Sequence, residues 1–200
     1  MILYFDTETT GLYPGHIVQL SYVMDYGDRT EGKNFYFSVD YVEPSAISVH
    51  GYTPEILFRL SDGKSFECFS DEIYNDFFSA DLLVAHNFKF DFEFLLAEFS
   101  YIGKQFRYRE SFDTMRYFTP VLKLPRKNSV AYKFPKLSEL CEYCDVFPYD
   151  VSRGVKEIFG KYSLNAHEAR FDTTAMYLCV QTISERLPEL KKLLDPYLMR

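Results

Sequence analysis

Apolar residues open the chain as an uninterrupted run. Residues 2–5 are all apolar or aromatic, which is the pattern of a strand buried on both faces. Residues 17–24 and 35–39 alternate and are enriched in Tyr, Phe and Val, and the turn-rich residues 25–33 join them. We therefore expect a sheet that begins with a strand and a hairpin and has antiparallel members.

Later segments show helical spacing or short apolar runs. Residues 88–101 have the i, i+3, i+4, i+7 spacing of a helix, and we expect Asn87 to cap it. The expected buried stripe of this helix consists of Phe92, Leu95, Leu96 and Phe99. The remaining pattern predicts a loop at 48–54 that leads into a helix capped by Thr53, a helix at 65–80, strands at 82–85 and 111–114, a helix at 137–144 and a long helix that ends near 187.

Two carboxylates follow the first strand. Asp6 and Glu8 are two residues apart, so along a strand both side chains leave the same face. Unpaired carboxylates at the end of a buried strand repel each other and lose hydration, and a divalent cation removes both costs. Their hard oxygen ligands suit Mg²⁺ or Mn²⁺. The alternative is a solvated strand end with two surface acids.

A third carboxylate, Asp91, lies in the first turn of the expected helix at 88–101, just after a strand end. Taken alone, it is an acid at a favourable helix N-terminus. In a chain that begins with Asp6 and Glu8, the same position at a strand-to-helix junction favours a shared site. His50, in the loop at 48–54, is expected to brace that loop rather than to serve the site.

The last candidate acid is Asp172, which shares a helical stripe with Met176, Cys179 and Ile183 and so faces the core. A carboxylate there needs a partner. His167 lies five residues earlier, roughly 140° around a helix of 3.6 residues per turn. If both serve one site, His167 belongs to a loop or to an irregular first turn. The alternative is a histidine exposed at a helix start.

Composition limits the class of protein. The 200 residues are 47% hydrophobic and 26% charged, which is ordinary for a globular chain, and we expect one domain over residues 1–200. Asp6 comes too early for a signal peptide, and no apolar run approaches membrane-spanning length. The four cysteines are scattered, so we expect a cytoplasmic protein with reduced thiols. Cys141-x-x-Cys144 lacks the second ligand pair of a zinc site.

Charge is distributed unevenly. The formal net charge is −7, but residues 104–136 contain nine Lys or Arg against only Glu110 and Asp113. This basic segment also carries many aromatic rings, a mixture suited to contacts with a nucleic-acid backbone and its bases. Arg126, Lys127 and Lys133 are its candidate substrate-binding residues. The alternative is a solvated basic loop whose rings are tucked into the core.

Taken together, Asp6-x-Glu8, His86-Asn-x-x-Phe-Asp91 and His167-x4-Asp172 resemble the three exonuclease motifs of the DnaQ-like (DEDDh) 3′→5′ exonucleases, in the same order. That family includes the proofreading epsilon subunit of DNA polymerase III and RNase T. The resemblance covers residues 2–187. Weaker similarities to the family are found at Thr9-Thr10-Gly11-Leu12, in the His50-Gly51 loop and at Asp113-Thr114.

The resemblance implies an RNase H-like α/β fold, with a mixed five-stranded sheet that has one antiparallel strand and is flanked by helices. It also implies two divalent cations, Mg²⁺ or Mn²⁺, with Asp6 bridging both, Glu8 and Asp172 on one, and Asp91 mainly on the other. His167 becomes the general base. The substrate-binding residues are the backbone around Thr9 and Thr10, Leu12 as a wedge between the last two bases, and Asn87.

We therefore expect a metal-dependent 3′→5′ exonuclease that acts on single-stranded DNA ends. An RNase T-like or oligoribonuclease-like exoribonuclease is the alternative enzyme. A nucleic-acid-binding or polymerase-scaffolding module that does not cut is the alternative from another class. The chain ends at Arg200, so we expect no tail of the kind that joins an epsilon subunit to its polymerase, and a polymerase partner is left open.

Overall fold

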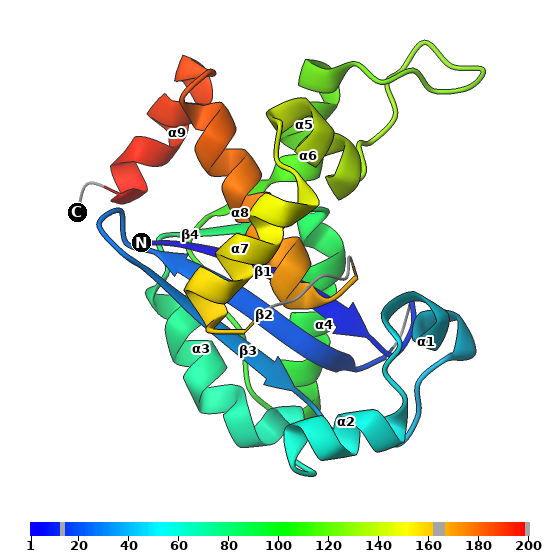
Figure 1. Ribbon diagram of the computed structural model, residues 1–200. Helices are drawn as coiled ribbons and strands as arrows, with labels where there is room; N and C mark the ends of the chain where they lie inside the picture. Colours follow the sequence, from blue (N-terminus) through cyan, green and yellow to red (C-terminus); the bar gives the residue numbers. More distant parts are fainter. Residues whose placement is uncertain (13–14, 162–166, 199–200) are drawn as a thin grey trace.

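A five-stranded sheet forms the centre of the protein (Figure 1). The computed structural model describes residues 1–12, 15–161 and 167–198. Across the sheet, the strands are β3 (Thr30–Tyr36), β2 (Ile17–Asp25), β1 (Ile2–Thr9), β4 (Leu82–Ala85) and β5 (Ser111–Asp113). Only β2 runs against its neighbours in this sheet, because β1 pairs with β2 antiparallel and with β4 parallel. The predicted RNase H-like fold class is therefore confirmed.

Side-chain alternation along β1 divides the core into two layers. Ile2 and Tyr4 pack on one face of the sheet, while Leu3 and Phe5 pack on the other. The first face is covered by α5 (Thr114–Leu122), α6 (Leu137–Cys144), α7 (Pro148–Phe159), α8 (Ala169–Ser184) and α9 (Pro188–Leu198). The second face is covered by α3 (Ser70–Ser79) and α4 (Phe88–Tyr101). Burial on both faces explains why residues 2–5 show no polar alternation.

Helix α4 has the predicted bounds and part of the predicted buried face. Leu95 and Phe99 are buried as predicted and Phe92 is half-buried, but Leu96 is exposed. The buried face also contains Phe88, Asp91, Phe94 and Glu98, two of which are acids that a search for apolar periodicity does not count. Asn87 is the N-cap residue of α4, as predicted, but it has a left-handed conformation with φ of 74° and its side chain makes no cap hydrogen bond. The prediction was therefore right in position and wrong in the bond.

Several other boundaries differ from the predictions. Pro44–His50 form helix α1, which ends at the left-handed Gly51, so the predicted loop shrinks to three residues before α2 (Pro54–Ser61). Thr53 caps α2 as predicted. The predicted helix at 65–80 is a 3₁₀ turn, η1 (Phe66–Phe69), followed by α3. β3 begins at Thr30 rather than Phe35, because the hairpin turn is tight. Helices α5, α7 and α9 were not predicted.

Residues 123–136, here called the arm, extend away from the body between α5 and α6 (Figure 1). Within the arm, Pro125 and Tyr132 form an isolated antiparallel bridge, and the Lys133 N–H donates to the Leu124 carbonyl at 3.0 Å. The later half of the basic segment is thus irregular, as its prolines predicted. None of the helices in the described ranges is long and apolar enough to cross a membrane.

Candidate active site

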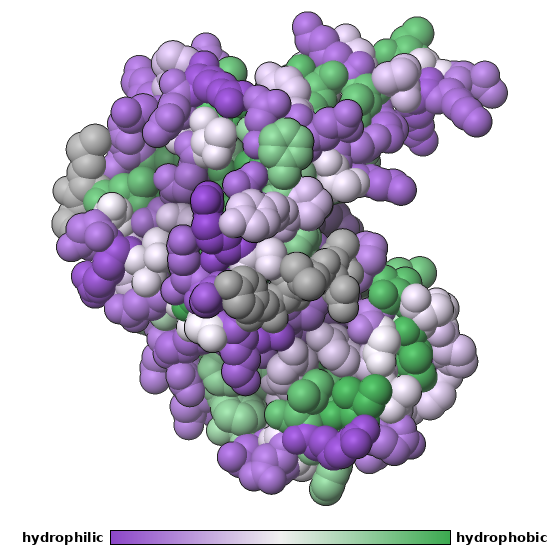
Figure 2. Space-filling view, in the orientation of Figure 1, coloured by the Kyte–Doolittle hydropathy of each residue, from purple (hydrophilic) through white to green (hydrophobic). Residues whose placement is uncertain are grey.

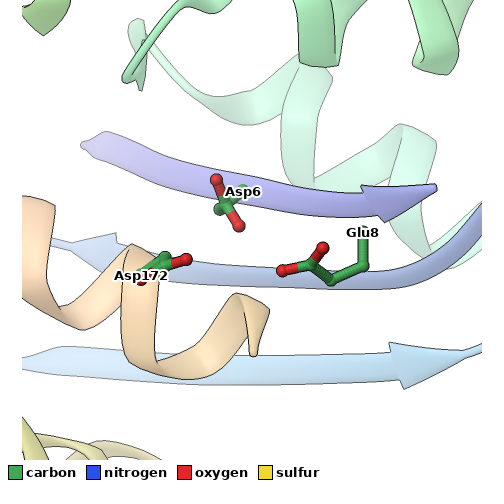
Figure 3. Close-up of side chains that lie close together, drawn as sticks. All are labelled: Asp6, Glu8 and Asp172. Carbon is green, nitrogen blue, oxygen red and sulfur yellow. The ribbon is translucent and has the colours of Figure 1, made fainter. Parts of the chain in front are cut away.

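Three carboxylates converge where β1 meets the start of α8. Asp6 and Glu8 follow Ile2 and Tyr4 in the alternation of β1, so both point to the sheet face that α8 covers. Asp172 extends from the first turn of α8 toward them (Figure 3). One oxygen from each of the three carboxylates lies within 4.8 Å of the other two. The shared face predicted for Asp6 and Glu8 is therefore present, and Asp172 faces it.

Asp91 reaches the same strand from the opposite face of the sheet. Its Oδ1 accepts two hydrogen bonds from Thr7, one from the backbone N–H at 3.0 Å and one from the hydroxyl at 2.7 Å. Asp91 is buried and stands outside the group of three converging oxygens. Its negative charge still acts on Asp6 and Glu8. The structure thus brings three of the predicted acids together. The fourth, Asp91, is bonded to Thr7, the residue of β1 that lies between Asp6 and Glu8.

Burial and mutual repulsion make these acids hold protons more tightly than ordinary carboxyl groups. Burial, reinforced by the charges of neighbouring carboxylates, raises the pKa of Glu8 to about 8 and that of Asp6 well above its usual value. Burial also raises the pKa of Asp91 to about 7 and that of Asp172 to about 6. A set of hard carboxylate oxygens that repel one another fits a divalent cation such as Mg²⁺ or Mn²⁺, which would stabilise their charged forms.

His167 lies just before α8 in a left-handed conformation, with φ of 63°. Its backbone N–H donates to Asp172 Oδ2 at 3.1 Å, and its Nδ1 lies 4.0 Å from the same oxygen. The side chain is 63% exposed. His167 therefore occupies an irregular turn rather than the face of α8, as its angular offset from Asp172 required. Its backbone is fixed to the acid cluster while its ring faces solvent.

The residues after β1 form a braced turn. The Thr9 hydroxyl donates to the Gly11 carbonyl at 2.7 Å, and the Thr10 hydroxyl accepts from the His16 N–H at 2.8 Å. His50 accepts the Tyr52 N–H on Nδ1, so Nε2 carries the proton and donates to the Thr9 carbonyl at 3.1 Å. His50 thus braces the strand end.

Leu12 projects from this turn with 81% of its surface exposed. An apolar side chain so exposed has no role in the core and is available to contact a base. Asn87 lies between β4 and α4, where its N–H donates to Asp113 Oδ1 at 3.2 Å. Its side chain is not used to cap α4.

The basic segment divides into two parts. Phe106, Phe112 and Phe118 are buried, whereas Tyr132 and Phe134 in the arm are exposed. The buried rings belong to the core, as the alternative predicted, whereas contact of the exposed rings with nucleic acid stays a prediction. Figure 2 shows the surface hollowed between the side that carries the arm and the side that carries α1, and in Figure 1 β1 ends toward this hollow.

The three candidate cations of the arm are not equivalent. Arg126 and Lys127 are exposed, and neither forms an ion pair within the described ranges. Lys133 is bound to Glu139 of α6, and its charge is therefore partly neutralised by a neighbour. Of these three candidates, two are thus unpaired within the described ranges and one already has a partner.

Two residues near the acids were missed from the sequence. Gln19 is fully buried in β2 and pairs across the sheet with Glu8. Glu168 is buried directly between His167 and α8. Gln19 was noticeable only as a polar residue inside an apolar run. Glu168 stood inside the third motif, but motif spacing gave it no role.

Comparison with known proteins agrees with this geometry. The exonuclease family model named for RNase T matches residues 3–147, more than half of the chain. Among curated proteins, the chain is similar to the DNA polymerase III subunit epsilon of Escherichia coli (strain K12), with 37% identity over 109 residues, which are 50% of this chain and 43% of that protein.

Two further epsilon subunits match over a longer stretch. That of Salmonella typhimurium is 33% identical and that of Pasteurella multocida 31% identical, each over 159 residues, which are 74% of this chain. These stretches cover 60% and 58% of the two relatives, so the chain spans little more than half of their length. With a matching family model, a five-stranded mixed sheet and three converging acids, the chain belongs to the DnaQ-like 3′→5′ exonuclease family.

Proposed function

We propose that this protein is a metal-dependent 3′→5′ exonuclease that releases nucleoside monophosphates, with single-stranded DNA ends as its substrate. The observation that carries the proposal is the convergence of Asp6, Glu8 and Asp172 within 4.8 Å, with His167 tied to Asp172. Exposed acids alone are a common surface feature. Partly buried acids that raise one another's pKa, beside a histidine, form a site suited to phosphodiester hydrolysis.

The acid cluster would hold two divalent cations, with Asp6, Glu8 and Asp172 around one and Asp91 contributing to the other. Bound there, such ions supply neutralisation of the phosphate oxygens and stabilisation of the leaving alkoxide. Asp91 has one oxygen committed to Thr7, which leaves Oδ2 as its free ligand atom. The rigid hydrogen bonds to Thr7 would hold that oxygen in place.

His167 is the proposed general base. A neutral imidazole has an unprotonated ring nitrogen that can take a proton from the attacking water. The ring is exposed and lies beside the acids, and its backbone is fixed by Asp172. It can therefore reach a water bound at the cluster without a large movement of α8.

The 3′ end would enter at the turn that follows β1. Thr9 and Thr10 are buried with their hydroxyls engaged, so their backbone is the part that can meet the terminal nucleotide. Leu12 would separate the last two bases, and Asn87 would contact the strand from the other side of the cluster. The arm would contact the upstream backbone with Arg126 and Lys127, and with Lys133 to a smaller extent.

Single-stranded DNA is the proposed substrate because the curated relatives are named as subunits of a DNA polymerase. An exoribonuclease is the second candidate, and the name of the matching family model favours it. A polymerase partner is suggested only by the names of those relatives, which are longer than the matched stretch. The cytoplasmic location stays a prediction.

A nuclease assay tests the proposal. DNA and RNA oligonucleotides of one sequence, labelled at the 5′ end, are incubated with Mg²⁺, Mn²⁺ or EDTA. We expect a ladder that shortens from the 3′ end, requires the metal and forms faster with DNA. Faster cleavage of RNA would favour the exoribonuclease over the DNA exonuclease. Slower migration of the oligonucleotide in a native gel without any shortening would identify a binding module and contradict the proposed enzyme activity.

A further inference from the structure

Glu168 is a further carboxylate at the border of the acid cluster. Its side chain is buried, and its Oε2 makes no hydrogen bond with any residue of the described ranges. Burial is the main cause of the raised pKa values of Asp6, Glu8 and Asp172, and the negative charge of Glu168 raises each of them further. A buried acid that worsens this repulsion needs a compensating role.

Gln19 of β2 indicates that role, because its side chain forms hydrogen bonds with residues 168 and 169 and so connects them to the sheet. Its Nε2 donates to Glu168 Oε1, and its Oε1 accepts from the Ala169 N–H at 3.2 Å. Gln19 is fully buried and lies directly across the β1–β2 ladder from Glu8. Both polar atoms of one amide thus connect the start of α8 to the strand position beside Glu8.

Glu168 also organises the first turn of α8. Its carbonyl accepts from the N–H groups of Phe171 at 2.7 Å and Asp172 at 3.1 Å. Its Oε1 accepts from Arg170 Nε at 2.7 Å, so a cation balances its charge. One residue therefore contacts the sheet through its side chain and the helix through its backbone.

We propose that Glu168 is a positioning residue: its bond to Gln19 holds the start of α8 against β2, which sets His167 and Asp172 in register with Glu8. The inference rests on the proposed function, because it assigns a role within that site. It follows from the two-sided attachment of Glu168 and from the left-handed turn at His167, which has its N–H bonded to Asp172. Loss of the attachment would let that turn relax.

The kinetic test compares Glu168→Ala with Glu168→Gln. Alanine removes the acceptor for Gln19, and we expect kcat to fall roughly 10–100-fold, the range for residues that orient active-site groups, with KM little changed. Glutamine keeps an oxygen acceptor and should recover most of the rate. Gln19→Ala should lower kcat similarly, and the double variant should lose no more than either single variant. Glu185→Ala, at the exposed far end of α8, is the matched control.

A second readout does not depend on activity. Amide hydrogen exchange in the metal-free protein reports the N–H groups of His167 and Ala169, which are bonded to Asp172 and Gln19. In Glu168→Ala we expect both to exchange about tenfold faster, while Glu168→Gln and Glu185→Ala match the wild type. A wild type without nuclease activity would overturn the proposed function, but this exchange pattern would still support the anchor.

Metal titration gives the outcome that overturns the inference. If Glu168→Ala and Glu168→Gln both weaken Mn²⁺ binding in calorimetry to the same degree, with unchanged amide exchange, Glu168 is a metal ligand rather than a positioning residue. Unchanged exchange together with an unchanged kcat in Glu168→Ala would show that the attachment to Gln19 has no effect on the site.

Discussion

The end of β1 and the arm are both candidate contacts with nucleic acid, but they are built in opposite ways. At the end of β1, the acids are held by the fold: Asp91 by two bonds from Thr7, and Asp172 within a helix that packs on the sheet. In the arm, Arg126 and Lys127 project from an irregular segment with one isolated bridge. The first region is rigid and partly buried, whereas the second is open to solvent.

This difference matches the physical demands of the two proposed tasks. Hydrolysis requires ligand atoms placed within fractions of an ångström, so its residues must come from packed elements. Attraction of a phosphate backbone falls slowly with distance, so cations on an exposed loop suffice. Substitutions at the end of β1 should therefore change turnover by orders of magnitude, and substitutions in the arm should change binding modestly.

The largest effect is expected for Asp6→Asn. Asp6 is central to the acid cluster, and losing several kcal/mol of metal-dependent stabilisation would lower kcat roughly 10³-fold or more, at about 1.36 kcal/mol per factor of ten. The same change removes one charge from a repelling group, so the metal-free variant should melt at a higher temperature than the wild type. Single-turnover kinetics and a melting curve in EDTA measure the two effects.

Asp28→Asn, in the exposed hairpin turn, provides the matched control and should change neither value. Retention of full activity in Asp6→Asn, or in wild-type protein with EDTA, would contradict the metal site. A lower melting temperature for metal-free Asp6→Asn would instead show that Asp6 stabilises the fold, which is the reverse of the expected repulsion.

The next effect concerns His167→Ala. A general base acts in the transition state, so kcat should fall roughly 10²–10⁴-fold while metal and oligonucleotide affinities stay near normal. A rise of wild-type activity with pH that depends on this base should vanish or shift in the variant. Metal-bound water can produce a similar rise, so the comparison of the two profiles decides. Turnover at nearly the wild-type rate would assign the base to another group.

A smaller effect is expected for the pH dependence of stability without metal. The raised pKa values of Glu8, Asp91 and Asp172, about 8, 7 and 6, mean that the folded protein keeps protons that the unfolded chain releases near pH 4. Stability of the metal-free protein should therefore fall as pH rises from about 4 toward 8. Each kcal/mol lost should lower the melting temperature by roughly 2–4 °C.

Melting curves in EDTA at pH 5, 6.5 and 8 measure this trend. Saturating Mg²⁺ or Mn²⁺ should reduce it, because the metal binds the deprotonated carboxylates and stabilises the folded state. Glu8→Gln removes the group with the highest pKa of the three and should flatten the curve. A metal-free protein that grows more stable toward pH 8 would contradict the raised pKa values.

Much of the fold was predictable because short-range patterns determine it. The apolar run at residues 2–5 and the bounds of β4, α4 and α6 agree with the structure. Helices α5, α7 and α9 were missed, although the apolar positions of α7 (Val151, Val155, Ile158 and Phe159) and of α9 (Leu190, Leu193, Leu194 and Tyr197) follow helical spacing. The buried face of α4 was only partly predicted, because Asp91 and Glu98 also lie on it. Such buried acids are stabilised by tertiary contacts, which spacing along one helix does not reveal.

The candidate site was likewise predictable only where short-range patterns determine it. Asp6 and Glu8 share a strand, so local geometry fixes their common face. Asp172 joins them only through packing of α8 on the sheet, and the family resemblance supplied that link. Gln19 and Glu168 were missed because their bond joins residues 149 positions apart. Long-range hydrogen bonds leave no periodic signal in the sequence.

The smallest effect is expected in the arm. The double change Arg126→Ser and Lys127→Ser should lower the salt dependence of oligonucleotide binding by up to about 1.4 units of slope, at about 0.7 per phosphate contact on a single strand, with kcat at saturation unchanged. Adding Lys133→Ser should change the slope less than Arg126→Ser or Lys127→Ser does, because Glu139 already neutralises part of the charge of Lys133. Lys191→Ser with Lys192→Ser, exposed on α9, is the matched control. An equal loss of slope in arm and control variants would show that only net charge matters and that the arm makes no specific contact.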